Sequence, residues 1–193
     1  MKIILELAEK QQKKAFEIIN DTGIIEAWKS VGADINLVGS LKTGLLVKHR
    51  DIDFHIYSDP LLISDSFKAI QKISENPTIK KVEYVNLIDT EEKCLEWHVW
   101  YSDVGNEIWQ IDMIHILKGS AFDGFAENMA EKILEELTEE TRNIILQLKY
   151  QTPDSEEIHG IEYYKAVLKD GVKNFQEFLE WRKSNPFGGI MEF

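Results

Sequence analysis

Cysteine, long apolar runs and basic residues are all scarce in this sequence, and each shortage excludes a class of protein. Cys94 is the single cysteine, so no internal disulfide can form and a reducing compartment is favoured. We interpret Cys94 as a passive residue. No apolar run approaches the roughly 20 residues of a membrane helix, and Glu6 interrupts the N-terminus too early for a signal peptide. We therefore expect a cytoplasmic protein that does not bind a membrane.

The shortage of basic residues bears on binding partners. Lysine and arginine total 22 against 34 aspartate and glutamate residues, which gives a formal net charge of −12. Because long nucleic acids are held mainly by basic side chains that neutralise phosphates, this balance disfavours a long polynucleotide substrate. It leaves open a small ligand, or a cationic one that a negative cleft would concentrate.

What the chain does have is the composition of an ordinary globular protein, with 44% hydrophobic and 29% charged residues. Its 193 residues allow one sizeable core or two small modules that share an interface.

Apolar spacing along the chain predicts an α+β fold with two parts. A break at Lys118-Gly119-Ser120 separates a mixed pattern from one that is purely helical. We therefore expect a core over residues 1–118 and a C-terminal helical module over residues 119–193 that packs against it. In the first part we expect helices over 7–19, 24–31 and 64–74, a short helix or loop over 41–48, a hairpin turn over 104–107, and strands over 35–38, 51–57, 81–88, 95–104 and 108–117. In the second part we expect helices over 122–136, 139–150, 161–168 and 175–183.

Two aspartates within residues 51–57 are the first candidates for a functional site. Asp51 and Asp53 are two residues apart, so on a strand both carboxylates point to the same face. The pair alone is weak evidence, since 34 acidic residues produce such spacings by chance. An edge strand with one solvated face is the simpler interpretation of Asp51, Asp53 and His55 together.

Asp112 is the third candidate, and a solvated edge strand does not explain it. It lies in the nearly continuous apolar run of residues 108–117, which predicts a central strand buried on both faces. A buried carboxylate is normally paired or bound to metal, so the alternatives are a cation site or a salt bridge to Arg50, Lys48 or Arg142. Hard divalent ions such as Mg²⁺ take carboxylate oxygens, and a pair of them serves in-line phosphoryl displacement.

A Gly39-Ser40 pair ends the run of residues 35–38 and is separated from Asp51 by ten residues. Such a pair is often only a turn. However, glycine lets phosphates approach the backbone, and serine can donate a hydrogen bond to them. The sequence through Gly44 lacks the glycine that a P-loop carries directly before its Lys-Thr pair, so a P-loop is rejected.

In combination, these elements resemble the polymerase-beta-type nucleotidyltransferases. The shared features are a strand that ends in Gly39-Ser40, a gap with basic residues, then Asp51-Ile52-Asp53, and a later strand acid, Asp112. Residues 47–54 further resemble the small aminoglycoside and lincosamide nucleotidyltransferases. The resemblance covers residues 37–114 and implies a nucleotidyltransferase fold, with a mixed β-sheet flanked by helices and a C-terminal helical module.

The resemblance also implies roles for individual residues. Gly39 and Ser40 would hold the triphosphate. Two Mg²⁺ ions would bind at Asp51 and Asp53, and Asp112 would complete the metal site or act as the base on the acceptor hydroxyl.

Further residues are weaker candidates. Basic side chains near the motif would help to neutralise phosphates, although solvation is the simpler account of them. Aromatic and basic residues of the last helices either line the acceptor cleft or pack against neighbours. These candidates are Lys42, Lys48 and Arg50 for phosphates, His55 for the acceptor, and Lys149, Tyr163 and Tyr164 for the acceptor cleft.

The implied reaction is Mg²⁺-dependent transfer of a nucleoside monophosphate, expected to be AMP, from a nucleoside triphosphate to a hydroxyl of a small-molecule acceptor. Two alternatives stay open. One is a non-catalytic regulatory module of the same fold, similar to an antitoxin. The other is nucleic-acid polymerisation or tRNA end-processing, which the net charge of −12 opposes.

Overall fold

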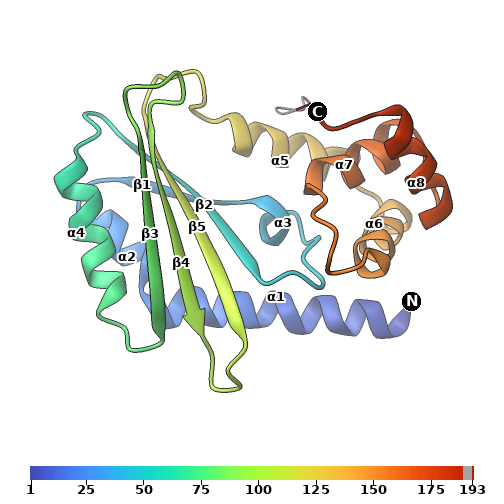
Figure 1. The fold of residues 1–193 in the computed structure, drawn as a ribbon, viewed down its shortest axis with the longest axis horizontal. Helices are drawn as coiled ribbons and strands as arrows, with labels where there is room; N and C mark the ends of the chain where they lie inside the picture. Colours follow the sequence, from blue (N-terminus) through green and yellow to red (C-terminus); the bar gives the residue numbers. More distant parts are fainter. Residues whose placement is uncertain (189–192) are drawn as a thin grey trace.

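The computed structural model describes residues 1–188 and 193, and it contains a five-stranded sheet with helices packed against it (Figure 1). None of the described helices is long and apolar enough to cross a bilayer. The first half contains α1 (Lys2–Thr22), α2 (Ile24–Lys29), β1 (Asp34–Val38), α3 (Gly39–Lys42), β2 (Asp51–Ser58), α4 (Ile63–Ser74) and β3 (Ile79–Leu87). The second half contains β4 (Cys94–Ser102), β5 (Ile108–Leu117), α5 (Phe125–Glu136), α6 (Glu139–Gln151), α7 (Gly160–Tyr164), the π-helical turn η1 (Lys165–Lys169) and α8 (Phe175–Ser184).

The sheet is mixed, with the strand order β1-β2-β5-β4-β3. Strand β2 runs parallel to β5, whereas β1 and β2, β5 and β4, and β4 and β3 pair in antiparallel fashion. Helices flank this sheet, so the predicted α+β fold is confirmed. The predicted hairpin is also present, because β4 and β5 are joined by a turn in which the Asp103 amide donates to the Glu107 carbonyl at 3.0 Å.

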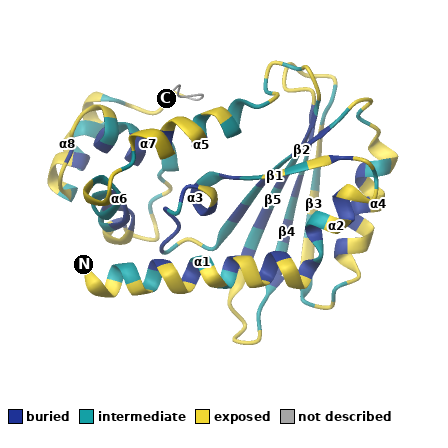
Figure 2. Ribbon diagram, turned by 180° about the vertical axis from the view of Figure 1, so that it is seen from behind, coloured by how far each residue is buried: buried dark blue, intermediate teal, exposed yellow. Residues whose placement is uncertain are grey.

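One face of the sheet is apolar, because alternate residues of each strand point toward it. Ile52 and Phe54 of β2 and Ile111 and Met113 of β5 are buried there. Helices α1, α2 and α4 cover this face (Figure 2). From α2, the indole N–H of Trp28 donates to the Met113 sulfur at 3.2 Å. Burying each of these large side chains stabilises the fold by about 1.5–3 kcal/mol.

The opposite face of β5 is polar and only half-buried around Gln110 and Asp112, so the prediction of a strand buried on both faces is wrong for this part of the strand. Ile111 and Met113 are buried, whereas Gln110 and Asp112 on the other face are half-buried. The physical reason is that helices α1, α2 and α4 cover only the apolar face. The other face borders a cavity, and a sheet with one open face tolerates polar residues on that side.

A second core lies beside the sheet, among the C-terminal helices (Figure 1). The rings of Tyr163 and Phe178 stack within it, with their centroids 4.7 Å apart. Leu45 and Val47, in the connection between α3 and β2, are buried in the same core. This connection therefore ties the sheet to the C-terminal helices. The division of the chain at residue 118 stays a prediction.

Helix α1 contributes to both cores. Ala8 is buried in the second core and Ala15 in the first. Between them, Gln12 Nε2 donates to the carbonyls of Gly44 at 3.1 Å and Leu46 at 3.3 Å. The helix thus also holds the connection between α3 and β2.

Helix boundaries differ from the predictions at several places, and two of the differences are informative. Helix α1 begins at Lys2 instead of residue 7, because Ile4 and Leu5 pack against the second core. The helix predicted over 161–168 is divided into α7 and the π-helical turn η1. Local apolar spacing does not predict which distant segments a residue packs against.

Candidate active site

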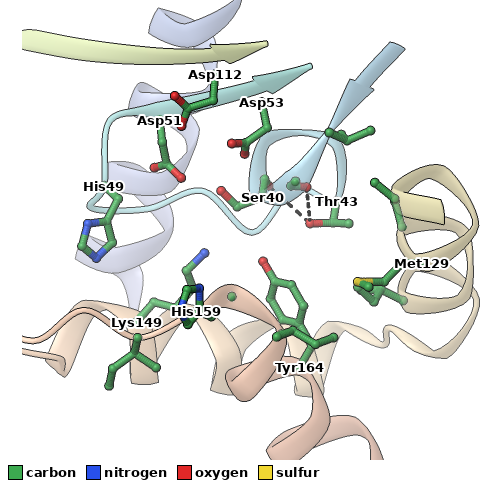
Figure 3. A pocket seen from close by; sticks show the side chains of 18 of the residues that line it. Ser40, Thr43, His49, Asp51, Asp53, Asp112, Met129, Lys149, His159 and Tyr164 are labelled. Carbon is green, nitrogen blue, oxygen red and sulfur yellow. Dashed lines mark hydrogen bonds between the residues drawn. The ribbon is translucent and has the colours of Figure 1, made fainter. Parts of the chain in front are cut away.

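A cavity of about 890 Å³ lies between the polar face of the sheet and the C-terminal helices (Figure 3). Both sequence motifs border it, so the structure brings the predicted Gly-Ser pair and the three acids together. Residues of the C-terminal half face them across the cavity. Its lining includes Gly39, Ser40, Thr43, His49, Arg50, Asp51, Asp53, His55, Gln110, Asp112, Met129, Lys149, His159 and Tyr164.

The three aspartates lie close together because β2 and β5 are neighbours in the sheet. Asp53 is directly opposite Asp112, and Asp51 is two residues earlier on the same face. Burial raises the pKa of Asp53 to about 8; the charges of Asp51 and Asp112 add to this effect and Lys149 opposes it. Oδ1 of Asp51 is buried without a hydrogen-bond partner. Carboxylates that repel one another and lack donors fit a divalent cation, which would neutralise them.

Asp112 differs from the other two, because its carboxylate is already hydrogen-bonded. His98 Nδ1 lies 2.6 Å from Oδ1. The side-chain amide of Gln110 donates to Oδ1 at 2.9 Å and to Oδ2 at 3.1 Å. The side chain of Asp112 is 24% exposed, so it is accessible from the cavity.

The basic residues considered as salt-bridge partners of Asp112 lie elsewhere. Arg50 lines the cavity, but its guanidinium is paired with Glu107. Lys48 is paired with Asp154 at 2.7 Å. Within residues 1–188, the expected alternative is therefore wrong: Asp112 forms no ion pair with Arg50, Lys48 or Arg142.

The Gly39-Ser40 pair directly follows β1 and opens α3. Gly39 has a φ of +68°, a left-handed conformation that glycine adopts without steric cost. A Cβ atom at this position would lie 2.0 Å from Oδ2 of Asp53. The Thr43 hydroxyl donates to the Gly39 carbonyl at 3.2 Å and holds the turn. Gly39 therefore makes room for Asp53, in addition to the phosphate contact that the resemblance implies.

Ser40 has a buried hydroxyl that borders the cavity and has no hydrogen-bond partner. Leaving such a group unpaired costs about 1–3 kcal/mol. We expect Ser40→Ala to keep or slightly raise the stability of the ligand-free protein, and to weaken triphosphate binding about tenfold. Thermal unfolding and equilibrium binding of a nucleoside triphosphate measure the two effects.

A matched control for Ser40→Ala is Thr43→Val, which removes a hydroxyl that is hydrogen-bonded. This control should lower stability by about 1 kcal/mol. If Ser40→Ala destabilises the protein as much as Thr43→Val does, the Ser40 hydroxyl has a structural partner and is not reserved for a ligand.

The structure separates two of the lysine candidates. Lys42 is exposed and is not among the residues that line the cavity. Lys149, for which both lining of the acceptor cleft and packing were open, is buried and borders the cavity opposite the aspartates (Figure 3). Its ammonium group donates to the Leu45 carbonyl at 3.0 Å and lies 5.7 Å from the centre of the Tyr164 ring.

Sequence reasoning missed Gln110, His98, Thr43 and His159. The alternation of β5 carried a signal for Gln110, because a residue two positions before Asp112 shares its face. His98 is placed by the pairing of β4 with β5, which sets it directly opposite Asp112. No local pattern carries that register.

His55 borders the cavity but is engaged in a local network. Its Nδ1 lies 3.2 Å from the Tyr57 hydroxyl, and that hydroxyl donates to Glu127 at 2.8 Å. Burial lowers the pKa of His55, and the charge of Glu127 partly offsets this effect. Contact of His55 with an acceptor stays a prediction.

Cys94 is buried beside Glu92 and Glu96. Burial raises the pKa of its thiol to about 12, and the two carboxylates reinforce the shift. The thiol is therefore protonated near neutral pH, which agrees with a passive residue because the thiolate is the reactive form.

The five-stranded mixed sheet with its flanking helices has the nucleotidyltransferase fold. No family model and no curated protein sequence matches the chain. Solved structures of similar fold include the Cid1 poly(U) polymerase with MgGTP bound, which has 15% identity over 86% of this chain and 54% of that chain, with a TM-score of 0.61. Cid1 with Mg 3′-dATP bound has 16% identity over 86% and 53%, with a TM-score of 0.60. The non-canonical poly(A) polymerase complex GLD-2–GLD-3 has 9% identity over 96% and 64%, with a TM-score of 0.55.

These similarities establish the fold and nothing finer. The chain spans about half the length of the Cid1 chains it matches. The narrower likeness to the small aminoglycoside and lincosamide nucleotidyltransferases stays a prediction.

Proposed function

We propose that this protein is a nucleotidyltransferase that uses Mg²⁺. The observation that carries the proposal is the cavity in which Asp51, Asp53 and Asp112 lie beside the Gly39-Ser40 turn. The raised pKa of Asp53 and the unpaired oxygen of Asp51 support a cation at the two β2 aspartates. Two Mg²⁺ ions bound there would stabilise the attacking and leaving oxygens of an in-line displacement.

The residues divide into two sets around the transferred group. Gly39 and Ser40 hold the triphosphate, and the buried Lys149 adds a positive charge on the opposite wall of the cavity. Asp112 lies on the acceptor side, next to β4. An acceptor hydroxyl oxygen forms a bond to the α-phosphorus, and the bond from that phosphorus to the pyrophosphate oxygen breaks. The carboxylate of Asp112 takes up the proton of the hydroxyl, and the electrons of the broken bond leave with pyrophosphate.

A small hydroxyl-bearing acceptor is the first candidate. The net charge of −12 opposes binding of a long polyanion. Near the cavity, Arg50 and Lys48 are paired with Glu107 and Asp154. Two of the cations near the cavity are thus already neutralised by acidic partners, which supports a short acceptor over a long nucleic acid.

The 3′ end of an RNA is the second candidate acceptor. It is favoured by the structural neighbours, which are described as a poly(U) polymerase and a poly(A) polymerase.

Pyrophosphate release with each of the four labelled ribonucleoside triphosphates tests the proposal and identifies the transferred nucleotide, for which AMP is our expectation. The acceptors are a panel of small hydroxyl compounds and a short single-stranded RNA. Label on a small compound supports the first candidate, and an RNA lengthened by one or more residues supports the second. Metal-dependent triphosphate binding without release of pyrophosphate would instead support a non-catalytic regulatory module.

Lys149→Met is expected to raise the KM for the triphosphate about 10- to 100-fold, with a smaller change in kcat. Methionine keeps much of the length of the side chain but removes the charge that faces the phosphate site. Steady-state kinetics with the triphosphate as the varied substrate measures the effect.

Lys48→Met is the matched control, because it removes one positive charge from the pair with Asp154. It should change KM less than about threefold, as expected for a partly exposed ion pair. Equal effects of the two variants would mean that only the total charge matters and that Lys149 has no special position.

A further inference from the structure

The carboxylate of Asp112 is held by two neighbours on the same sheet face. Antiparallel pairing sets His98 of β4 directly opposite Asp112 of β5, and Gln110 precedes Asp112 by two residues. His98 Nδ1 lies 2.6 Å from Oδ1, and Gln110 Nε2 lies 2.9 Å from the same oxygen. In the tautomer that carries its proton on Nδ1, His98 donates to this carboxylate oxygen.

The two oxygens of Asp112 are therefore not equivalent. Among the described residues, Oδ1 has contacts with both neighbours, whereas Oδ2 has a single side-chain contact, the longer one from Gln110 at 3.1 Å. The β2 aspartates contrast with this arrangement. No side-chain donor contacts Asp51 or Asp53 among the described hydrogen bonds, and Oδ1 of Asp51 is buried and unpaired.

We propose that His98, with Gln110, is a positioning residue that fixes Oδ1 of Asp112 and leaves Oδ2 to accept a hydrogen bond from the acceptor hydroxyl. The proposal rests on the proposed function. It divides the three acids: Asp51 and Asp53 serve the cations, and Asp112 orients the nucleophile. Holding a reacting group in place through an outer hydrogen bond typically changes activity about 10- to 100-fold.

The location of His98 agrees with this role. Its side chain is 26% exposed, on the polar face of the sheet, and its second nitrogen, Nε2, lies 3.8 Å from Glu96. A half-exposed pair of this kind contributes little to stability. The contact therefore affects the direction of the Asp112 carboxylate more than it affects the fold.

Three variants test the proposal. His98→Phe keeps a ring of similar size but removes the donor, and it should lower kcat about 30-fold while the KM for the triphosphate stays within about twofold. His98→Asn retains a donor near the position of Nδ1 and should recover most of the activity. Glu96→Gln is the control, because Glu96 lies near Nε2 of His98 and not near Nδ1. Its activity should equal that of the wild type.

A measurement without turnover separates this proposal from the proposed function. In ¹⁵N spectra of the histidine rings, His98 should carry a proton on Nδ1 in the wild type, and Asp112→Ala should reduce that population. Full activity of His98→Phe, or equal losses in His98→Phe and His98→Asn, would overturn the positioning role. If the wild type transfers no nucleotide, the proposed function fails. If the ¹⁵N spectrum of the His98 ring is unchanged in Asp112→Ala, the hydrogen bond between His98 and Asp112 does not exist, and the positioning role fails.

Discussion

Asp53→Asn is expected to lower nucleotidyl transfer about 1,000-fold or more, and Asp51→Asn to do the same. Each change removes a negative oxygen that would hold a cation next to the reacting phosphate, and electrostatic stabilisation of this kind is usually the largest part of catalysis. Asparagine is close to aspartate in size, so the sheet should stay intact. Initial rates of pyrophosphate release, together with Mg²⁺-dependent triphosphate binding, measure the loss. Unchanged binding and transfer in both variants would show that the site has been assigned to the wrong residues.

The same Asp53→Asn change should make the metal-free protein more stable, by about 1–2 kcal/mol. In the unfolded chain this carboxyl ionises at its ordinary pKa of 3.8, whereas burial and its neighbours raise the pKa to about 8 in the folded protein. Between these values folding takes up a proton, so the contribution of Asp53 to stability falls as the pH rises from 3.8 to about 8. The advantage of Asp53→Asn over the wild type should therefore grow across this interval.

Urea unfolding at pH 5 and pH 8 in the presence of a chelator measures this difference. Asp89→Asn is the control, because Asp89 is exposed and its replacement should leave stability nearly unchanged at both pH values. If the wild type and Asp53→Asn have equal stability at pH 8, Asp53 is neither desolvated nor repelled by the charges of its neighbours.

Gly39→Ala is expected to reduce triphosphate-dependent activity about 100-fold or more and to destabilise the fold by about 2–4 kcal/mol. The new Cβ would lie 2.0 Å from Oδ2 of Asp53, so either the turn or the aspartate must move. Movement of either one would separate the proposed phosphate-binding turn from the proposed metal ligand. For a chain of this size, the expected loss corresponds to a drop in Tm of roughly 5–15 °C.

The matched control for this change is Gly32→Ala. Gly32 also has a positive φ, of +80°, but a Cβ at that position would meet no atom within 4 Å. Gly32→Ala should therefore cost about 1–2 kcal/mol of stability through backbone conformation alone, without a steric clash. It should leave activity unchanged. Equal effects on activity in the two variants would mean that backbone conformation, and not the contact with Asp53, explains the need for glycine.

Several parts of the fold follow from local patterns. The α+β fold, the hairpin and the shared face of Asp51 and Asp53 depend on short-range alternation and turn chemistry. The grouping of Gly39 with the aspartates came from an ordered motif, and Gly39, Ser40 and all three aspartates line the cavity.

Other features depend on contacts between distant segments, which a single sequence does not encode in any local pattern. Lys149 reaches the cavity because its helix packs against the connection that contains Leu45, which is 104 residues away in sequence. His98 faces Asp112 only through the register of β4 and β5. The apolar run around Asp112 indicated burial on both faces of the strand. This prediction failed because the sequence does not tell which face of the sheet the helices leave open.

Helix α1 has a consequence for how the molecule unfolds. Ala8 and Ala15 of this single helix are buried in different cores, and Gln12 between them holds the connection that leads to Asp51. Melting the helix would expose both cores at the same time. The two cores should therefore lose structure in one cooperative transition, and amide protons on either side of the cavity should share the same slowest exchange rate.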